Sequence, residues 1–392
     1  MTKKLFLENV LLRSCQAVVT DCVELKTGFG IELDQTVFYP EGGGQLSDTG
    51  KLLCAGKEIA VTHVRETEGR ILHETAEPLD KGTAVEAVID WQERFDHMQQ
   101  HCGEHLLSYG FWKLCEADNI GFHMSPEMVT IDLSREVSHE EIRQVEVLAN
   151  QHIQDDRPIT AEWMEVAAAA KCATRKFNDK LTGPVRVVSI DGSDACTCCG
   201  THPPMTGMVG LVKIFKAEKH KQGTRIYFLC GRLALQKITE GWQALTAAAQ
   251  LLSVKDVEIK LGVERLQEEN KELREIITAW ENRWVQEQAA RLLDFAPVVD
   301  GIKDITYKSQ DISAEAAKKL AQELSADEQV RATVFYVTKD RLNYVLAQGS
   351  AVSGSCRERI KDINEKYQGR GGGKDNMAQG SAPLGEIDFA TL

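Results

Sequence analysis

The stretch His101-Cys102-Gly103-Glu104-His105 is the starting point for the fold of this 392-residue chain. It follows an amphipathic segment that begins at Trp91, and it continues into Leu106-Leu107, so we expect it to lie within a helix. Histidines four residues apart project from the same helix face, with Cβ atoms about 5–6 Å apart. Two imidazoles at this spacing can bind one metal ion, although two histidines on a polar helix face would give the same pattern.

A second group of potential metal ligands occurs later, in Cys196-Thr197-Cys198-Cys199-Gly200-Thr201-His202. Two histidines from the helix together with one cysteine and one histidine from this group make an ordinary Zn²⁺ ligand set. We therefore expect one zinc ion per chain. The helix that supplies the first two ligands contains Gly103, which weakens a helical turn by roughly 1 kcal/mol relative to alanine.

The composition is that of a globular protein, with 43% apolar residues and a net charge of −13. No segment approaches the ~18 consecutive apolar residues of a membrane span, and the N-terminus does not resemble a signal peptide. Eleven cysteines, an odd number spread over a long chain, favour reduced thiols and a cytoplasmic location. We expect no membrane partner.

The negative net charge argues against a surface coated for nucleic acid. The segment 205–237 is nevertheless locally basic and contains Lys213 and Lys216, so it could bind RNA phosphates. A solvated basic hairpin is the alternative interpretation.

Residues 1–90 read as short strands separated by turns, which predicts a small antiparallel barrel or sandwich, a barrel being the expectation we adopt. Within this segment, Gly42-Gly43-Gly44 permits positive φ angles and a close approach of the backbone to a ligand. The tip of a flexible hairpin is the alternative. Gln45 follows directly and would supply an amide donor and acceptor.

The remainder predicts an α+β protein in three further parts: a mixed α+β domain at 91–235 with the zinc site, a helical coiled-coil segment at 236–293, and a C-terminal α/β domain at 294–392. The helical segment has a break near residues 253–256. Its apolar positions recur every seven residues in two rows, which contain Leu252, Ile259, Leu266, Leu273 and Trp280, and Val263, Asn270, Ile277 and Trp284. The partner of this coil is either another chain or the preceding helix folded back, and we expect a hairpin that also mediates a homodimer.

Four motifs in this order carry a family resemblance. They are Thr36-Val37-Phe38-Tyr39-Pro40-Glu41-Gly42-Gly43-Gly44-Gln45, His101-x-x-x-His105-Leu106-Leu107, Cys198-Cys199-Gly200-Thr201-His202 and Gly371-Gly372-Gly373-Lys374-Asp375-Asn376-Met377-Ala378-Gln379-Gly380. The first three resemble the editing domain of alanyl-tRNA synthetase and its standalone counterpart, the AlaX family. The last resembles the C-terminal domain that these synthetases share with DHH-type phosphoesterases. Together they cover nearly the whole chain, as in the long AlaX form.

The resemblance implies hydrolysis of tRNA(Ala) mischarged with serine or glycine. It implies zinc bound by His101, His105, Cys198 and His202, because Cys198 alone among the three nearby cysteines has the family's spacing to His202. Cys199 stands where the family usually has glycine, so Cys196 and Cys199 remain rival thiolates.

The resemblance also suggests roles for residues of the first and last motifs. The family's glutamine falls on Gln45 and its threonine, associated with the serine hydroxyl, on Thr36. We expect Gln45 and the backbone of Gly43 and Gly44 to position water and the substrate carbonyl. RNA contacts are expected from Arg370, Gly371, Gly372, Gly373 and Lys374, with the coil and the C-terminal domain joining two chains.

Two alternatives stay open at this stage. Zinc is either catalytic or structural, since Glu104 lies beside His105 and the HExxH arrangement of metalloproteases is missing. The protein is either a deacylase or a non-catalytic, zinc-stabilised tRNA-binding protein. We expect neither phosphoesterase nor aminoacylation activity, because the chain has no Asp-His-His motif and begins directly with the barrel.

Overall fold

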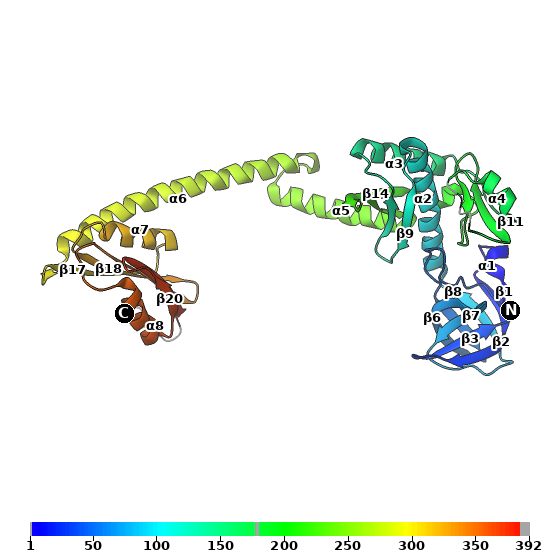
Figure 1. Cartoon of the computed structure of the whole chain (residues 1–392), viewed down its shortest axis with the longest axis horizontal. Helices are drawn as coiled ribbons and strands as arrows, with labels where there is room; N and C mark the ends of the chain where they lie inside the picture. The colour runs from blue at the N-terminus through cyan, green and yellow to red at the C-terminus, as the bar shows by residue number, and fades with distance from the viewer. Residues whose placement is uncertain (1, 176, 178–179, 385–392) are drawn as a thin grey trace. The chain divides into compact units, whose positions relative to one another are not determined.

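The computed structural model describes residues 2–175, 177 and 180–384. The chain forms two compact units, residues 1–246 and 247–392 (Figure 1). The predicted α+β class and the N-terminal barrel are confirmed. The expected boundary at residue 90 falls within the first unit, and the last eight residues of the expected 294–392 domain lie outside the described residues.

The N-terminal part is a closed barrel in which every strand pairs with two neighbours. Its strands, in order around the barrel, are β2 (Ser14–Glu24), β3 (Phe29–Leu33), β7 (Arg70–Thr75), β6 (Lys57–Thr67), β5 (Gly50–Cys54) and β8 (Ala84–Ile89). Alternating apolar residues such as Ile59, Val61 and Val64 point inwards and form its core. The short elements β1 (Lys3–Lys4), α1 (Leu5–Glu8) and β4 (Gln35–Thr36) lie beside it.

The rest of the first unit is built around the helix α2 (Trp91–Cys115), which begins where Asp90 accepts a hydrogen bond from the Glu93 N–H. A four-stranded antiparallel sheet packs against it, in the order β14 (Val212–His220), β15 (Gly223–Cys230), β10 (Val129–Leu133) and β9 (Asn119–Met124). The helix α3 (His139–Gln154) shares this core, and the short 3₁₀ helix η1 (Thr206–Val209) contacts it. The position of Gly103 follows from this packing, because a Cβ there would lie 2.1 Å from the Cys230 sulfur.

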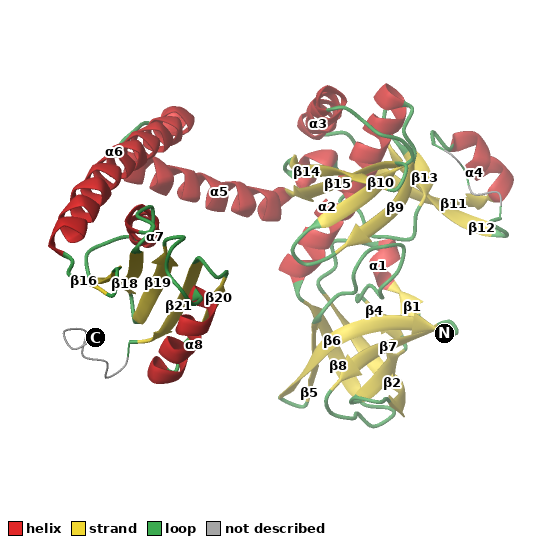
Figure 2. Cartoon of the chain, turned by 60° about the vertical axis from the view of Figure 1, so that its left-hand side comes forward, coloured by secondary structure: helices red, strands yellow, loops and turns green. Residues whose placement is uncertain are grey.

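A second, three-stranded sheet delivers the cysteine-rich segment. It consists of β11 (Ile159–Glu165), β12 (Pro184–Ile190) and β13 (Ala195–Thr197), with the helix α4 (Val166–Cys172) beside it (Figure 2). Cys198 follows β13 directly, so the sheet holds the start of the ligand-bearing loop.

A buried ion pair connects the barrel to α2. Arg94 donates from Nε to Asp48 Oδ1 at 2.8 Å, and both side chains are fully buried. Arg94 also donates to the Val37 carbonyl, and Asp48 accepts from the Tyr39 N–H, both at 2.6 Å. The segment from Val37 to Asp48 is therefore held on the first turns of α2.

The helix α5 (Gly231–Leu252) spans the boundary between the units and ends where a break was expected, before the short 3₁₀ helix η2 (Asp256–Glu258) and α6 (Ile259–Phe295). Several heptad residues of α6 are exposed, among them Leu273 with 58% of its surface accessible. Trp284 instead packs in the core of the second unit, next to Tyr307. No helix among the described residues is long and apolar enough to cross a membrane.

The second unit contains a six-stranded mixed sheet with helices on both faces. The strand order is β16 (Val298–Val299), β17 (Ile302–Ser309), β18 (Val330–Thr338), β19 (Arg341–Gln348), β21 (Met377–Pro383) and β20 (Arg370–Gly373). The end of α6 and the helix α7 (Ala314–Leu324) cover one face, and α8 (Cys356–Tyr367) covers the other. The glycines of the last motif, Gly371 to Gly373, thus lie in the edge strand β20.

Candidate metal centre and its cavity

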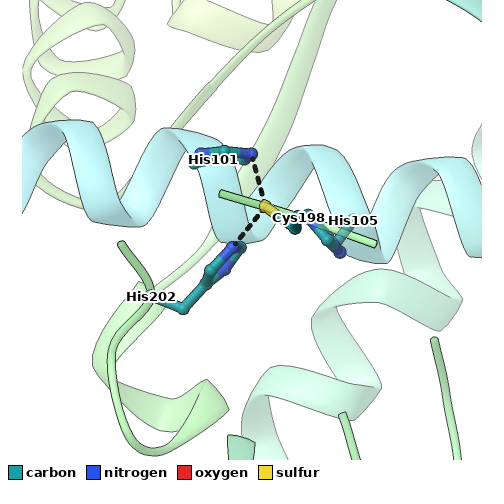
Figure 3. A group of neighbouring side chains, drawn as sticks. All are labelled: His101, His105, Cys198 and His202. Atoms are coloured by element: carbon teal, nitrogen blue, oxygen red, sulfur yellow. Dashed lines mark hydrogen bonds between the residues drawn. The ribbon is translucent and has the colours of Figure 1, made fainter. Parts of the chain in front are cut away.

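Four side chains from two distant segments converge on one point. His101 and His105 project from α2, and Cys198 and His202 come from the loop after β13 (Figure 3). The Cys198 sulfur lies 3.4 Å from His101 Nε2 and 3.3 Å from His202 Nε2. One ligand atom from each of the four residues lies within 4.8 Å of all the others, so the group can hold a metal ion.

The hydrogen bonds of two histidines fix which nitrogen faces the centre. His101 Nδ1 donates to Gln45 Oε1 and His105 Nδ1 donates to Asp194 Oδ2, both at 2.9 Å. Their Nε2 atoms are therefore the ones that would donate a lone pair to a metal ion, the arrangement typical of metal-bound imidazoles. A single thiol proton cannot satisfy the nitrogens that surround Cys198, whereas one cation would satisfy them all.

The electrostatics of the cluster suit a thiolate with neutral imidazoles. Burial raises the pKa of the Cys198 thiol, but the facing His101 and His202 outweigh it and hold that pKa well below its ordinary value. Burial lowers the pKa of His202 to about 3. His105 differs, since Cys196 and Asp194 outweigh burial and raise its pKa well above the ordinary value. A metal ion would displace that proton, and the donor set fits Zn²⁺.

The three rival cysteines occupy different places. Only the Cys198 sulfur lies with the three histidines. The Cys196 sulfur lies 3.5 Å from His105 Nδ1, on the side of Asp194, and Cys199 is exposed. The loop itself approaches the helix closely, because a Cβ at Gly200 would lie 2.1 Å from the His101 ring.

The glycine-rich motif forms a two-residue hairpin turn. Gly42 and Gln45 exchange backbone hydrogen bonds, and Gly43 and Gly44 both have positive φ, at 59° and 80°. This is the pattern of a type I′ turn, which favours glycine at both central positions. Gly44 has a second constraint, because a Cβ there would lie 2.4 Å from the Phe122 ring.

The turn delivers Gln45 to the metal cluster, but in a different position from the one expected. Its Oε1 accepts from His101 Nδ1 and from the Thr201 N–H at 3.0 Å, and its Nε2 donates to Thr201 Oγ1 at 2.8 Å. The amide is fully buried. Gln45 therefore connects the barrel hairpin, α2 and the ligand loop, and its side chain does not face the cavity.

Thr36 lies inside the barrel and is fully buried. His73 Nδ1 bonds the Ile31 carbonyl, so His73 Nε2 accepts a hydrogen bond from the Thr36 hydroxyl at 2.8 Å. The Thr36 oxygen also accepts from the Phe38 N–H at 3.1 Å. The structure thus does not bring Thr36 to the cavity described next.

A cavity of about 880 Å³ opens onto the metal cluster. The described residues that line it include His101, His105 and Cys198, the backbone turn at Gly43, and a set that the sequence did not single out: Glu104, Asn119, Phe122, Trp163, Arg175, Phe177 and Arg186. Burial raises the pKa of the Glu104 carboxyl, but His105 and Arg175 outweigh it and lower that pKa, so Glu104 is ionised. Two sequence signals pointed to members of this set: the position of Glu104 inside the motif, and the excess of basic residues between Lys171 and Arg186, which includes Arg175.

Arg175 and Asp194 form a support that sequence analysis missed. Arg175 donates from Nε and Nη2 to the two Asp194 oxygens at 2.8 and 2.7 Å, and Asp194 in turn holds His105. Neither residue belongs to a recognisable motif or to a periodic pattern, so only the folded chain reveals the pair.

None of the residues expected to bind RNA is among the described residues that line this cavity. Lys213 pairs with Glu146 at 2.7 Å, and Lys216 pairs with Glu218 and lies over the Tyr227 ring. Arg370 and Lys374 are exposed at β20 in the second unit. Packing explains the glycines at positions 371 and 373, because a Cβ at Gly371 or Gly373 would lie about 2.4 Å or less from the backbone of β21.

We predict that Asp194→Asn lowers zinc affinity by about tenfold to a hundredfold, because His105 loses the carboxylate that orients it. Competition with a chromogenic chelator measures this affinity directly. Asp191→Asn, an exposed change in the adjoining turn, is the matched control. Equal zinc affinities for the two variants would show that Asp194 does not support the centre.

Three family models match the chain in sequence order. They are tRNA synthetases class II (A) at residues 8–93, the threonyl and alanyl tRNA synthetase second additional domain at 185–227, and the DHHA1 domain at 301–391. The second of these covers the Cys198 and His202 loop. Among solved structures, the C-Ala domain of Aquifex aeolicus alanyl-tRNA synthetase matches 23% of this chain and 83% of its own at 19% identity, with a TM-score of 0.22 that is too low to bear on the fold.

Curated relatives align over nearly the whole chain. An alanine–tRNA ligase of Pyrococcus abyssi is 30% identical over 97% of this chain, which spans only 42% of that relative's length. The alanyl-tRNA editing protein AlaX-L of Pyrococcus horikoshii is 28% identical over 97% of this chain and 94% of its own. The alanyl-tRNA editing protein Aarsd1 of Mus musculus is 28% identical over 92% of this chain and 86% of its own. Over nearly its whole length the chain is therefore similar to long-form alanyl-tRNA editing proteins and to the corresponding part of alanyl-tRNA synthetases.

Proposed function

We propose that this protein is a zinc-dependent hydrolase that releases serine or glycine from mischarged tRNA(Ala) in the cytoplasm. The observation that carries the proposal is the convergence of His101, His105 and Cys198 at the wall of one open cavity. The similarity to alanyl-tRNA editing proteins supports the choice of substrate. A non-catalytic, zinc-stabilised tRNA-binding protein is the second candidate, because four protein ligands are also the hallmark of a structural zinc site.

The lining of the cavity suits the aminoacylated end of a tRNA. Trp163 exposes 64% of its surface there, and Phe122 and Phe177 add further aromatic surface. Unstacked bases bind to such aromatic faces, and Arg175 and Arg186 supply positive charge near the expected phosphates. This combination favours a nucleotide-linked substrate over a free amino acid.

The reaction needs little catalytic assistance from the protein, because an aminoacyl ester is already activated towards hydrolysis. Bound zinc would supply Lewis-acid polarisation of the carbonyl or of a water molecule. The protein's own contribution is placement. Gln45 fixes the His101 ring, Asp194 fixes the His105 ring, and the backbone at Gly43 borders the space where the ester carbonyl would lie. Backbone N–H groups at that position would stabilise the developing oxyanion.

We predict that the purified protein deacylates Ser-tRNA(Ala) and Gly-tRNA(Ala) and spares Ala-tRNA(Ala). Release of the labelled amino acid measures the three rates, with and without chelation followed by zinc restoration. Loss on chelation and recovery with zinc are expected. Binding of all three tRNAs without release of any amino acid would instead establish the non-catalytic candidate.

The same assay, applied to Thr36→Val, tests the selectivity for serine over alanine. The family resemblance assigns recognition of the serine hydroxyl to Thr36, and a site that bonds a hydroxyl discriminates strongly against an analogue without one. Because the Thr36 side chain bonds His73 inside the barrel and does not line the cavity, we propose that its effect on selectivity is indirect, through the position of the segment from Val37 to Gln45. The variant should narrow the difference between serine and alanine while it retains zinc. A lower melting temperature with unchanged selectivity would assign Thr36 to the barrel core, where it bonds His73.

We further propose that Lys213, Lys216 and the β20 edge, Arg370 to Lys374, contact the tRNA backbone. Arg370→Ala with Lys374→Ala should weaken tRNA binding and reduce the slope of its salt dependence, since each phosphate contact releases counterions. Lys213→Ala with Lys216→Ala is the comparison, and we expect a smaller effect because both lysines are paired with glutamates. Filter binding at several salt concentrations measures both pairs. An unchanged slope in the β20 variant contradicts that contact.

We propose a homodimer formed through α6 and the C-terminal domain. The exposed seam of Leu266, Leu273 and Ile277 is apolar over several turns, which is typical of a helix with a partner. In sedimentation equilibrium we expect the wild-type protein to have the mass of two chains. The double variant Leu273→Glu, Ile277→Glu should have the mass of one chain. Glu275→Lys, a charge change on another face of α6, should leave the mass unchanged. A wild-type protein of one-chain mass would contradict the proposal.

A further inference from the structure

Glu104 and Asp118 are the carboxylates among the described residues that line the cavity, and of the two only Glu104 is buried. Glu104 is neither a ligand of the metal cluster nor hydrogen-bonded to one. It lies on α2 beside His105, keeps only 6% of its surface accessible and lines the cavity. Desolvating a carboxylate is costly unless it gains a partner. The arrangement of its two oxygens shows which part of the carboxylate is free to bind something else.

The two oxygens are used very differently. Oε1 accepts from Ser108 Oγ at 2.6 Å and from Asn119 Nδ2 at 2.8 Å, and Asn119 also donates to Ser108 at 3.0 Å. No residue in the described part of the chain donates a hydrogen bond to Oε2, whose near neighbour is His105 Nε2 at 3.8 Å. Ser108 and Asn119 therefore lock the carboxylate in one orientation and leave Oε2 beside the metal cluster.

Arg175 does not satisfy Oε2. Arg175 approaches Glu104 only through Nη1, at 3.8 Å from Oε1, whereas its Nε and Nη2 atoms bond both oxygens of Asp194. Two carboxylates thus share one guanidinium, and the closer geometry belongs to Asp194. A positively charged group on the substrate could therefore pair with the second carboxylate, that of Glu104.

We propose that Glu104 Oε2 binds the α-ammonium group of the aminoacyl ester. This inference rests on the proposed function and deepens it. Every aminoacyl-tRNA carries this ammonium group next to the ester carbonyl, so a fixed carboxylate beside the metal cluster would place the carbonyl at the centre. A substrate with an acylated amine, such as peptidyl-tRNA, would leave Oε2 unpaired and be rejected. Glu104 would therefore confine hydrolysis to free aminoacyl esters.

The experiment compares Ser-tRNA(Ala) with N-acetyl-Ser-tRNA(Ala), which differ in the ammonium group. The wild-type protein should favour the free amine. Glu104→Gln should reduce kcat/KM for the free amine by about tenfold to a hundredfold, the range expected for a hydrogen bond between charged groups, with most of the loss in KM. The rate on the acetylated substrate and the zinc content should not fall. Glu140→Gln, at an exposed position of α3, is the matched control.

Three other results would overturn the inference. Equal slowing of both substrates by Glu104→Gln would assign the carboxylate to proton transfer or to the stability of the helix. A wild-type protein that hydrolyses both substrates equally well would show that the ammonium group is not recognised. Hydrolysis of neither substrate by the wild-type protein would instead refute the proposed function, and the inference with it.

A second variant tests the inference in case Glu104→Gln does not fold or does not bind zinc. Asn119→Ala removes one of the two donors that orient the carboxylate without changing its charge. It should reduce kcat/KM for the free amine by a smaller factor and leave the acetylated substrate unaffected. Equal rates to wild type on both substrates would contradict the inference.

Discussion

The buried ion pair between Asp48 and Arg94 is the contact on which the site depends. Both side chains are fully buried, and their hydrogen bonds extend to the backbone of Val37 and Tyr39. Loss of one partner would leave an uncompensated buried charge, which costs about 3–5 kcal/mol. Because Arg94 and His101 lie on the same helix, the pair sets where the barrel hairpin meets α2. Gln45 reaches His101 as a consequence.

Folding of the barrel and assembly of the metal cluster are therefore coupled. Gln45 touches both ligand-bearing segments, since it bonds His101 on α2 and Thr201 in the loop. The close approaches also need glycine: Gly200 lies against the His101 ring and Gly44 against Phe122. Metal binding would add its own free energy to the same junction, because the ligands come from segments that meet only in the folded chain.

Local patterns in the sequence encode part of the fold and part of the site. The four-residue spacings of His101 with His105 and of Cys198 with His202 identified the cluster that the structure brings together. Strand alternation predicted the barrel. Local patterns do not distinguish a residue that lines a cavity from one that supports its wall. Both Gln45 and Thr36 prove to be buried. Arg175, Asp194 and the free oxygen of Glu104 depend on tertiary contacts between distant segments, for which no periodicity exists.

The ligands of the cluster are not equally restrained. His101 is held by Gln45 and His105 by Asp194, whereas His202 Nδ1 is buried without a hydrogen-bond partner among the described residues. An imidazole without such a partner is oriented by its backbone and by the metal alone. The two helix ligands thus form the fixed side of the centre, and this side also carries Glu104. Any change in coordination would cost least at His202, which would leave the cavity wall and its carboxylate in place.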